Sequence, residues 1–255
     1  MITAEDPPGF VVRTEAQKAA SNNGFRIERG ADNGWLCFAS TTAQVAIWIA
    51  RASKDGPWLL SVDHPEVSAE FGLSPTAAAS GLGVATFAFD TLQALYGAVD
   101  RVYQLGISLP DAPLNAFRVA SRDLPRTTEA ERLVVQRVGQ DVFRQALLAY
   151  WGGRCPLTGI TEIQLLRASH IVPWADCETD EKRLEVHNGL LLSALWDAAF
   201  DAGLVSFADD GTAIASPCLT TEPAMALGLS NANRLTGLTG AHRANLAWHR
   251  SRYGF

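Results

Sequence analysis

The sequence has 255 residues, of which 47% are hydrophobic and 19% are charged, and its formal net charge is −6. This length is enough for one large or two small domains with a sizeable core. The negative charge argues against a protein whose whole surface is basic for nucleic acid. No apolar run reaches the length of a membrane span, and the first residues lack the regions of a signal peptide. We therefore expect a cytoplasmic protein with no membrane partner.

The four cysteines form no Cys-x-x-Cys pair. This spacing predicts free thiols, and no structural zinc is expected because such sites use closely spaced ligand pairs. A zinc site assembled from Cys155, Cys177 and His187 is the less favoured alternative.

The first part of the chain predicts a mixed α+β domain over residues 1–113. Residues 1 to about 24 are polar, and we expect a loosely held arm. Short apolar runs separated by turn residues follow as far as Val62, and Val84 to Phe89 has the composition of a further strand. Asp90 is expected to cap a helix from Thr91 to Leu105, whose apolar residues recur at helical spacing.

Three tryptophans in this domain, Trp35, Trp48 and Trp58, allow two interpretations. They could line a pocket for a flipped, modified base or for a small activating ligand. They could also belong to an ordinary aromatic core, which is the interpretation that we favour because aromatic side chains dominate core packing.

Prolines at both ends of residues 114–126 predict a linker, so that residues 127–255 form a second domain. Thr128-Glu-Ala-Glu131 is a capping box, and it begins a helix that continues to Trp151. Seven arginines but only four acidic residues lie between residues 118 and 154. Because the planar guanidinium group suits phosphate, the candidates for contact with a nucleic-acid backbone are Arg144, Arg154 and Arg167.

The most informative stretch begins at Cys155. Ile163 to Val172 has the apolar content of a strand, and Pro173 ends it, so His170 lies at a strand end. Asn188-Gly189 opens a second short strand over residues 190–192. A helix from residue 193 or 194 to Gly203 then places Asp197 and Asp201 one turn apart. Two carboxylates at that spacing can hold one hard cation.

This order of strand, loop, strand and helix resembles the HNH endonucleases, whose fold is a ββα-metal hairpin and helix. The resemblance covers Arg154 to about Gly211, and Trp174 and the Phe200-Asp-x-Gly stretch resemble the restriction-type branch. It implies that His170 is the general base that activates water and that Asn188 braces the hairpin. It also implies that Asp197 and Asp201 are metal ligands.

The sequence departs from that family at three places, one of which is Cys155-Pro-Leu-Thr158, where zinc-containing relatives carry a Cys-x-x-Cys half-site. Ser169 stands where many relatives have an Asp or His ligand, so it is only a weak candidate for the metal. Asp197 replaces the third histidine, and carboxylates favour Mg²⁺ or Mn²⁺ over Zn²⁺. His187 is a further candidate for phosphate contact.

The resulting hypothesis is a metal-dependent DNA endonuclease in restriction or defence, with an N-terminal domain that recognises modified DNA or an activating ligand. Its activity should rise between about pH 6 and 8, because a histidine base must be neutral. A double-strand break would need two centres, which makes a homodimer plausible. The alternative is a catalytically decayed HNH scaffold that acts as a DNA-binding or regulatory module. Ser169 and the missing third histidine motivate this alternative.

The remaining residues predict a hairpin, over residues 204–207 and 212–215, with an Asp-Gly turn. A terminal helix from Ala241 to about Arg252 carries several basic residues. This helix could contact phosphate or form a solvated face.

Overall fold

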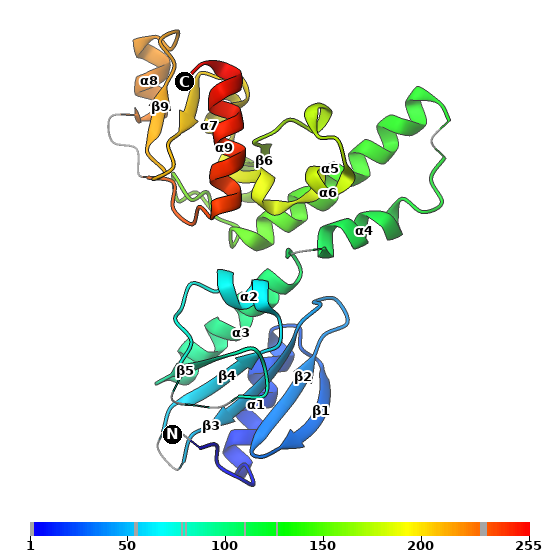
Figure 1. Ribbon diagram of the computed structural model, residues 1–255, viewed down its shortest axis with the longest axis vertical. Helices are drawn as coiled ribbons and strands as arrows, with labels where there is room; N and C mark the ends of the chain where they lie inside the picture. Colours follow the sequence, from blue (N-terminus) through cyan, green and yellow to red (C-terminus); the bar gives the residue numbers. More distant parts are fainter. Residues whose placement is uncertain are drawn as a thin grey trace. The chain divides into compact units, whose positions relative to one another are not determined.

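The computed structural model describes residues 3–53, 56–77, 79, 81–109, 111–125, 127–229 and 234–255. The chain divides into two compact units, Met1–Ala112 and Pro113–Phe255. Both contain helices and strands, which confirms the predicted α+β class (Figure 1). Among the helices in these ranges, none has the length and apolar character needed to cross a bilayer.

The N-terminal unit is built on an antiparallel five-stranded sheet in which each strand pairs with its neighbours in the chain. The strands are β1 (Ile27–Asp32), β2 (Trp35–Ala39), β3 (Ala46–Arg51), β4 (Trp58–Val62) and β5 (Ala85–Phe89). A row of paired residues, Leu36, Ile49, Leu60 and Phe87, crosses four of these strands and is buried throughout. The apolar run near Val45 forms strand β3, and residues on both of its faces are buried.

Three helices accompany this sheet: α1 (Phe10–Asn22), α2 (Pro65–Glu70) and α3 (Leu92–Gly106). The expected loose arm is wrong, since α1 packs against α3 and strands β2 and β3. It does so through Val12 and three buried alanines, Ala16, Ala19 and Ala20. Such small side chains give only a weak apolar pattern in the sequence. The cap of α3 is Thr91 rather than Asp90, because the Thr91 hydroxyl accepts a hydrogen bond from Ala94 N at 3.1 Å.

The C-terminal unit begins with two helices, α4 (Ala112–Ala120) and α5 (Glu129–Tyr150). The predicted linker is therefore helical over its first part, because Leu114 and Phe117 lie at helical spacing and are buried. The capping box of α5 is present, with Thr128 and Glu131 bonding each other's main chain.

The hairpin strands β6 (Leu166–His170) and β7 (Gly189–Ser193) follow, and helix α7 (Ala194–Asp201) continues directly from β7. The long loop between the strands contains α6 (Asp180–Leu184). Beyond α7 lie the paired strands β8 (Val205–Phe207) and β9 (Ala213–Ala215), then α8 (Thr221–Leu227) and α9 (Gly240–Tyr253). Helix α9 packs against β8, as Figure 1 shows.

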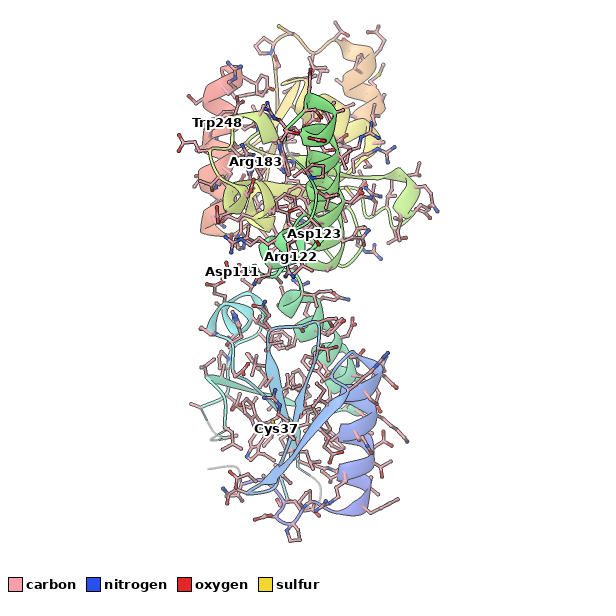
Figure 2. The ribbon with its side chains drawn as sticks, turned by 90° about the vertical axis from the view of Figure 1, so that its right-hand side faces the viewer. Cys37, Asp111, Arg122, Asp123, Arg183 and Trp248 are labelled. Atoms are coloured by element: carbon pink, nitrogen blue, oxygen red, sulfur yellow. The ribbon has the colours of Figure 1, made fainter. Side chains whose placement is uncertain are left out.

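The four cysteines are all free thiols. Cys37 lies in the sheet of the N-terminal unit (Figure 2), where burial raises the pKa of its thiol. Cys177 is buried in the loop between β6 and β7, and burial raises its thiol pKa too. Both groups are therefore protonated thiols at neutral pH.

Gly97 gives a test of the packing around α3. It is exposed within the helix, and a Cβ there would meet no atom within 4 Å. We predict that Gly97→Ala raises the free energy of unfolding by about 1 kcal/mol, because alanine loses less backbone freedom in a helix. The control is Gly106→Ala in the same helix, whose Cβ would lie 2.6 Å from Val45 Cγ1 and should destabilise. Urea denaturation measures both, and a destabilised Gly97→Ala variant would contradict the analysis.

Candidate active site

The hairpin and α7 bring together the four residues that the sequence singled out most strongly. In the register of β6 and β7, His170 pairs with Gly189, so Asn188 lies immediately beside the strand end that carries the histidine. Helix α7 contacts β6 as well as β7. The two acidic residues on the helix are therefore held against the strand that ends in His170.

His170 is packed between aromatic rings. Its imidazole stacks on Phe143 of α5, with ring centroids 3.8 Å apart, and meets the edge of Trp174 at 5.8 Å. Its Nε2 lies 2.9 Å from the main-chain oxygen of Arg183. A carbonyl only accepts hydrogen bonds, so Nε2 carries the hydrogen and the neutral ring keeps its lone pair on Nδ1.

The surroundings of His170 favour this neutral form. Burial lowers the pKa of His170 below its ordinary value, and the hydrogen bond to the Arg183 carbonyl opposes this only in part. The imidazole is therefore a neutral proton acceptor at pH 7.

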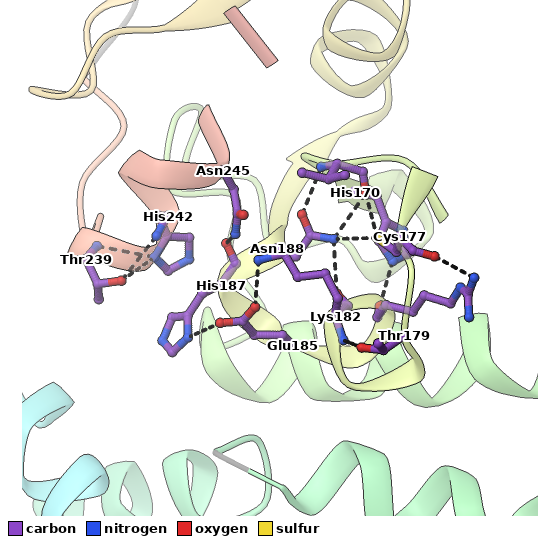
Figure 3. Close-up of polar contacts among 12 residues, drawn as sticks. His170, Cys177, Thr179, Lys182, Glu185, His187, Asn188, Thr239, His242 and Asn245 are labelled. Carbon is purple, nitrogen blue, oxygen red and sulfur yellow. Dashed lines mark hydrogen bonds and ion pairs between the residues drawn. The ribbon is translucent and has the colours of Figure 1, made fainter. Parts of the chain in front are cut away.

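Asn188 is fully buried and connects both ends of the loop between β6 and β7 (Figure 3). Its Oδ1 accepts a hydrogen bond from Val172 N at 2.8 Å, and its Nδ2 lies 3.1 Å from Val172 O. The same Nδ2 lies 3.2 Å from the oxygen of Lys182, the residue before Arg183. One side chain thus fixes the main chain just beyond His170 and the peptide next to the carbonyl that His170 binds.

Arg183, labelled in Figure 2, was not identified from the sequence, yet its guanidinium group holds several points of the same loop. It donates to Trp174 O at 3.2 Å and Cys177 O at 2.6 Å, and it pairs with Asp180 at 3.0 Å. It also lies over the Trp174 ring. In the sequence it belongs to a charged run, Asp180 to Glu185, which is typical of a solvated face and gives no sign of these contacts.

The two carboxylates of α7 have different surroundings. Asp197 accepts a hydrogen bond from the hydroxyl of Ser169, which is buried in β6. Loss of hydration and, second, the negative charge of Asp197 raise the pKa of Asp201 to about 6, although the residue as a whole is exposed to solvent. Such an acidic pair suits a hard divalent cation, which would relieve the repulsion between the two charges. In the described ranges, no group of three or more His, Cys, Asp or Glu side chains is arranged around a common metal position.

His170 and Asp201 line one pocket of about 390 Å³. Its other lining residues are Gln140, Ala168, Ile171, Pro173, Trp174, His249 and Tyr253. A proton acceptor and a carboxylate therefore share a partly open hollow. His249 and Tyr253 come from α9, a contribution to the pocket that the sequence did not indicate.

The predicted phosphate contacts are not among the residues that line this pocket. Arg144 donates to the oxygens of Leu166 and Ile163, and Arg167 to those of Gln164 and Leu166. Arg154 donates to Gly159 O, and His187 Nδ1 lies 3.5 Å from Glu185. In this structure these side chains support the turn before β6 and the start of β7.

The three tryptophans of the N-terminal unit do not form one pocket. Trp35 and Trp48 lie on one face of the sheet and belong to one apolar cluster. Trp58 pairs with Arg51, whose side chain points to the opposite face. Trp35 and Trp58 are both buried, as the aromatic-core interpretation expects. A hollow of the same unit lies elsewhere, lined mainly by small and apolar residues of α3, β5 and the end of α2.

The bonds of Asn188 give a prediction about stability. Asn188→Ala should lower the free energy of unfolding by about 2–4 kcal/mol, because it leaves the buried Val172 N–H without its acceptor and removes the bonds to the carbonyls of Val172 and Lys182. Asn245→Ala is the matched control, since Asn245 is also buried and donates one hydrogen bond, to His187 O at 2.8 Å. Urea denaturation of both variants measures the difference. A smaller loss for Asn188→Ala than for Asn245→Ala would contradict the bracing role.

Comparison with known proteins bears on the same segment. Residues 155–208, which contain β6, β7 and α7, match the HNH endonuclease family HNH_2. No curated protein matches the sequence. The predicted resemblance is confirmed for this segment: residues 155–208, within the C-terminal part of the chain, match the HNH endonuclease family.

Proposed function

We propose that this protein is a metal-dependent DNA endonuclease that hydrolyses phosphodiester bonds at the pocket between His170 and α7. The observation that carries the proposal is the pairing of a neutral imidazole with a carboxylate in one hollow. The family match supports nuclease activity in general. The DNA substrate, the metal and the roles of single residues belong to the proposal.

His170 acts as the general base. Its Nδ1 accepts a proton from a water molecule as the water oxygen attacks the phosphorus atom and the bond to the 3′ oxygen breaks. The leaving oxygen takes a proton from solvent, and the imidazolium then returns its own proton to solvent. The carbonyl of Arg183 holds Nε2–H throughout, so the ring keeps its orientation while Nδ1 gains and loses the proton.

Asp197 and Asp201 would hold the divalent cation, with the Ser169 hydroxyl orienting Asp197. An all-oxygen set of this kind fits Mg²⁺ or Mn²⁺. When bound, the cation supplies positive charge against the phosphate oxygens and the leaving oxygen.

The N-terminal unit is the recognition part of this proposal, in a restriction or defence role. Its support is that it forms a separate compact unit with its own sheet and lies outside the segment matched by the nuclease family. A double-strand break would use two copies of the centre. Comparing cytosine-modified with unmodified plasmid tests this role.

We predict that the native protein nicks or cuts supercoiled plasmid with Mg²⁺ or Mn²⁺ but not with EDTA, and that His170→Ala lowers the rate at least about 100-fold, as expected when a general base is lost. His64→Ala is the control, because His64 only caps α2 in the N-terminal unit. Cleavage is followed on agarose gels. If the native protein binds DNA but does not cleave it, the proposal is contradicted. That result would favour a decayed scaffold that acts as a DNA-binding or regulatory module.

The pH profile follows from the environment of His170. A base must be neutral, so activity is lost as pH falls through its pKa, which burial places below the ordinary value of about 6.5. We therefore expect kcat/KM to be level from about pH 7 upward and to fall only in more acidic solution. This corrects the sequence-based window of pH 6 to 8. An acid limb centred above pH 7, measured at saturating metal, would be inconsistent with the buried imidazole as base.

A further inference from the structure

We propose that helix α9 is part of the active centre and that Tyr253 and His249 are positioning residues, which hold the carboxylate of Asp201 beside His170. This inference rests on the proposed function. Helix α9 (Gly240–Tyr253) lies outside residues 155–208, the segment that matches the nuclease family. The contribution is therefore made by a part of the chain that the family match does not include.

The end of α7 is where α9 acts. The last carbonyls of a helix have no partner inside the helix and need one elsewhere. Here the carbonyls of Ala198 and Ala199 accept from Ala202 N and Leu204 N, and that of Phe200 accepts from Gly203 N. Two further bonds to the last carbonyls come from α9.

His249 supplies the first of these bonds. It is buried, its Nε2 donates to Phe200 O at 3.2 Å, and its Nδ1 lies 3.0 Å from the Ser206 hydroxyl. Its ring stacks on Phe200 with centroids 3.9 Å apart and an angle of 4°. Burial lowers the pKa of His249 to about 4, so the ring stays neutral. The last turn of α7 is thus fixed by both a ring contact and a hydrogen bond.

Tyr253 supplies the second bond. Its hydroxyl donates to the main-chain oxygen of Asp201 at 3.0 Å. The ring lies against Gly203, where a Cβ would come within 2.2 Å of it, and Gly203 has a φ of +65° that favours glycine. Gly203 lets the tyrosine reach Asp201 for two reasons. Its positive φ turns the chain after α7, and it has no side chain to meet the tyrosine ring.

Helix α9 is itself anchored on both sides of the centre. Asn245 donates to His187 O at 2.8 Å, next to Asn188 (Figure 3). Arg250 donates to Phe207 O at 2.6 Å and pairs with Asp209 at 2.7 Å. One helix therefore links the turn before β7, which contains Asn188, with the end of α7, which carries Asp201.

The position of Asp201 makes these contacts important for its carboxylate. It is the last residue of α7, and helix ends fray. Asp197 lies a full turn earlier and is held by Ser169. The bond from Tyr253 fixes the backbone of Asp201 instead, and the tyrosine and histidine also line the pocket with His170. Loss of this bond should loosen one of the two proposed metal ligands and leave the other in place.

The test uses the full-length protein and the substitution Tyr253→Phe, which removes the hydroxyl and keeps the ring. Tyr96→Phe is the matched control, because the Tyr96 hydroxyl bonds Glu15 in the N-terminal unit. Mn²⁺ binding is measured by calorimetry without DNA, and amide hydrogen exchange of Ala202 and Leu204 is measured in the metal-free protein. We expect Tyr253→Phe to weaken Mn²⁺ binding about tenfold, a typical effect of losing a group that orients a metal ligand. Exchange at α7 should be faster, and the control should change neither.

The outcomes separate this inference from the proposed function. Unchanged Mn²⁺ affinity in Tyr253→Phe, with or without faster exchange, would overturn the positioning role, since a merely structural contact leaves the affinity intact. No Mn²⁺ binding by the native protein would overturn the proposed metal site and this inference with it. Weaker Mn²⁺ binding together with a higher Mg²⁺ requirement for nicking, at an unchanged melting temperature, would support the inference.

Discussion

The carbonyl of Arg183 determines which chemistry His170 can perform. Because it accepts from Nε2, it orients the ring and leaves the lone pair on Nδ1. That carbonyl belongs to the short helix α6 in the loop between β6 and β7, and side chains hold this helix in place. Asn188 holds the neighbouring peptide and the Arg183 guanidinium group holds three other points of the loop. The proposed base is therefore set by buried hydrogen bonds rather than by its strand alone.

The other half of the centre, the carboxylates, is positioned by different means. Helix α7 starts where β7 ends, so the hairpin fixes its first turn, while α9 fixes its last. The base and the carboxylate of Asp201 thus meet in one pocket although they are supported by separate contacts. Disturbance of the loop should affect His170 first, whereas disturbance of α9 should affect Asp201 first.

The sequence was informative where function depends on neighbours in the chain. His170, Asn188, Asp197 and Asp201 lie within about thirty residues, and strand, turn and helix spacing together with the resemblance to the HNH family predicts that they form one centre. It was uninformative where function depends on distant or main-chain partners. Arg183 looks like part of a solvated charged run, and nothing local indicates that Tyr253 reaches the carbonyl of Asp201. The alternative of one pocket lined by the three tryptophans could not be judged from the sequence for the same reason: the register that separates Trp58 from Trp48 is a property of strand pairing.

The replacement of an expected acidic ligand by Ser169 is consistent with the charge balance of the site. Two carboxylates match the charge of a divalent cation, and the second already has its pKa raised to about 6 partly by the first. A third carboxylate at residue 169, buried in β6, would add a further negative charge beside the pair and favour protonation over metal binding. The serine hydroxyl instead donates to Asp197 and orients it without adding charge. On this argument Ser169 is a support of the proposed metal site, and its presence does not by itself indicate a decayed enzyme.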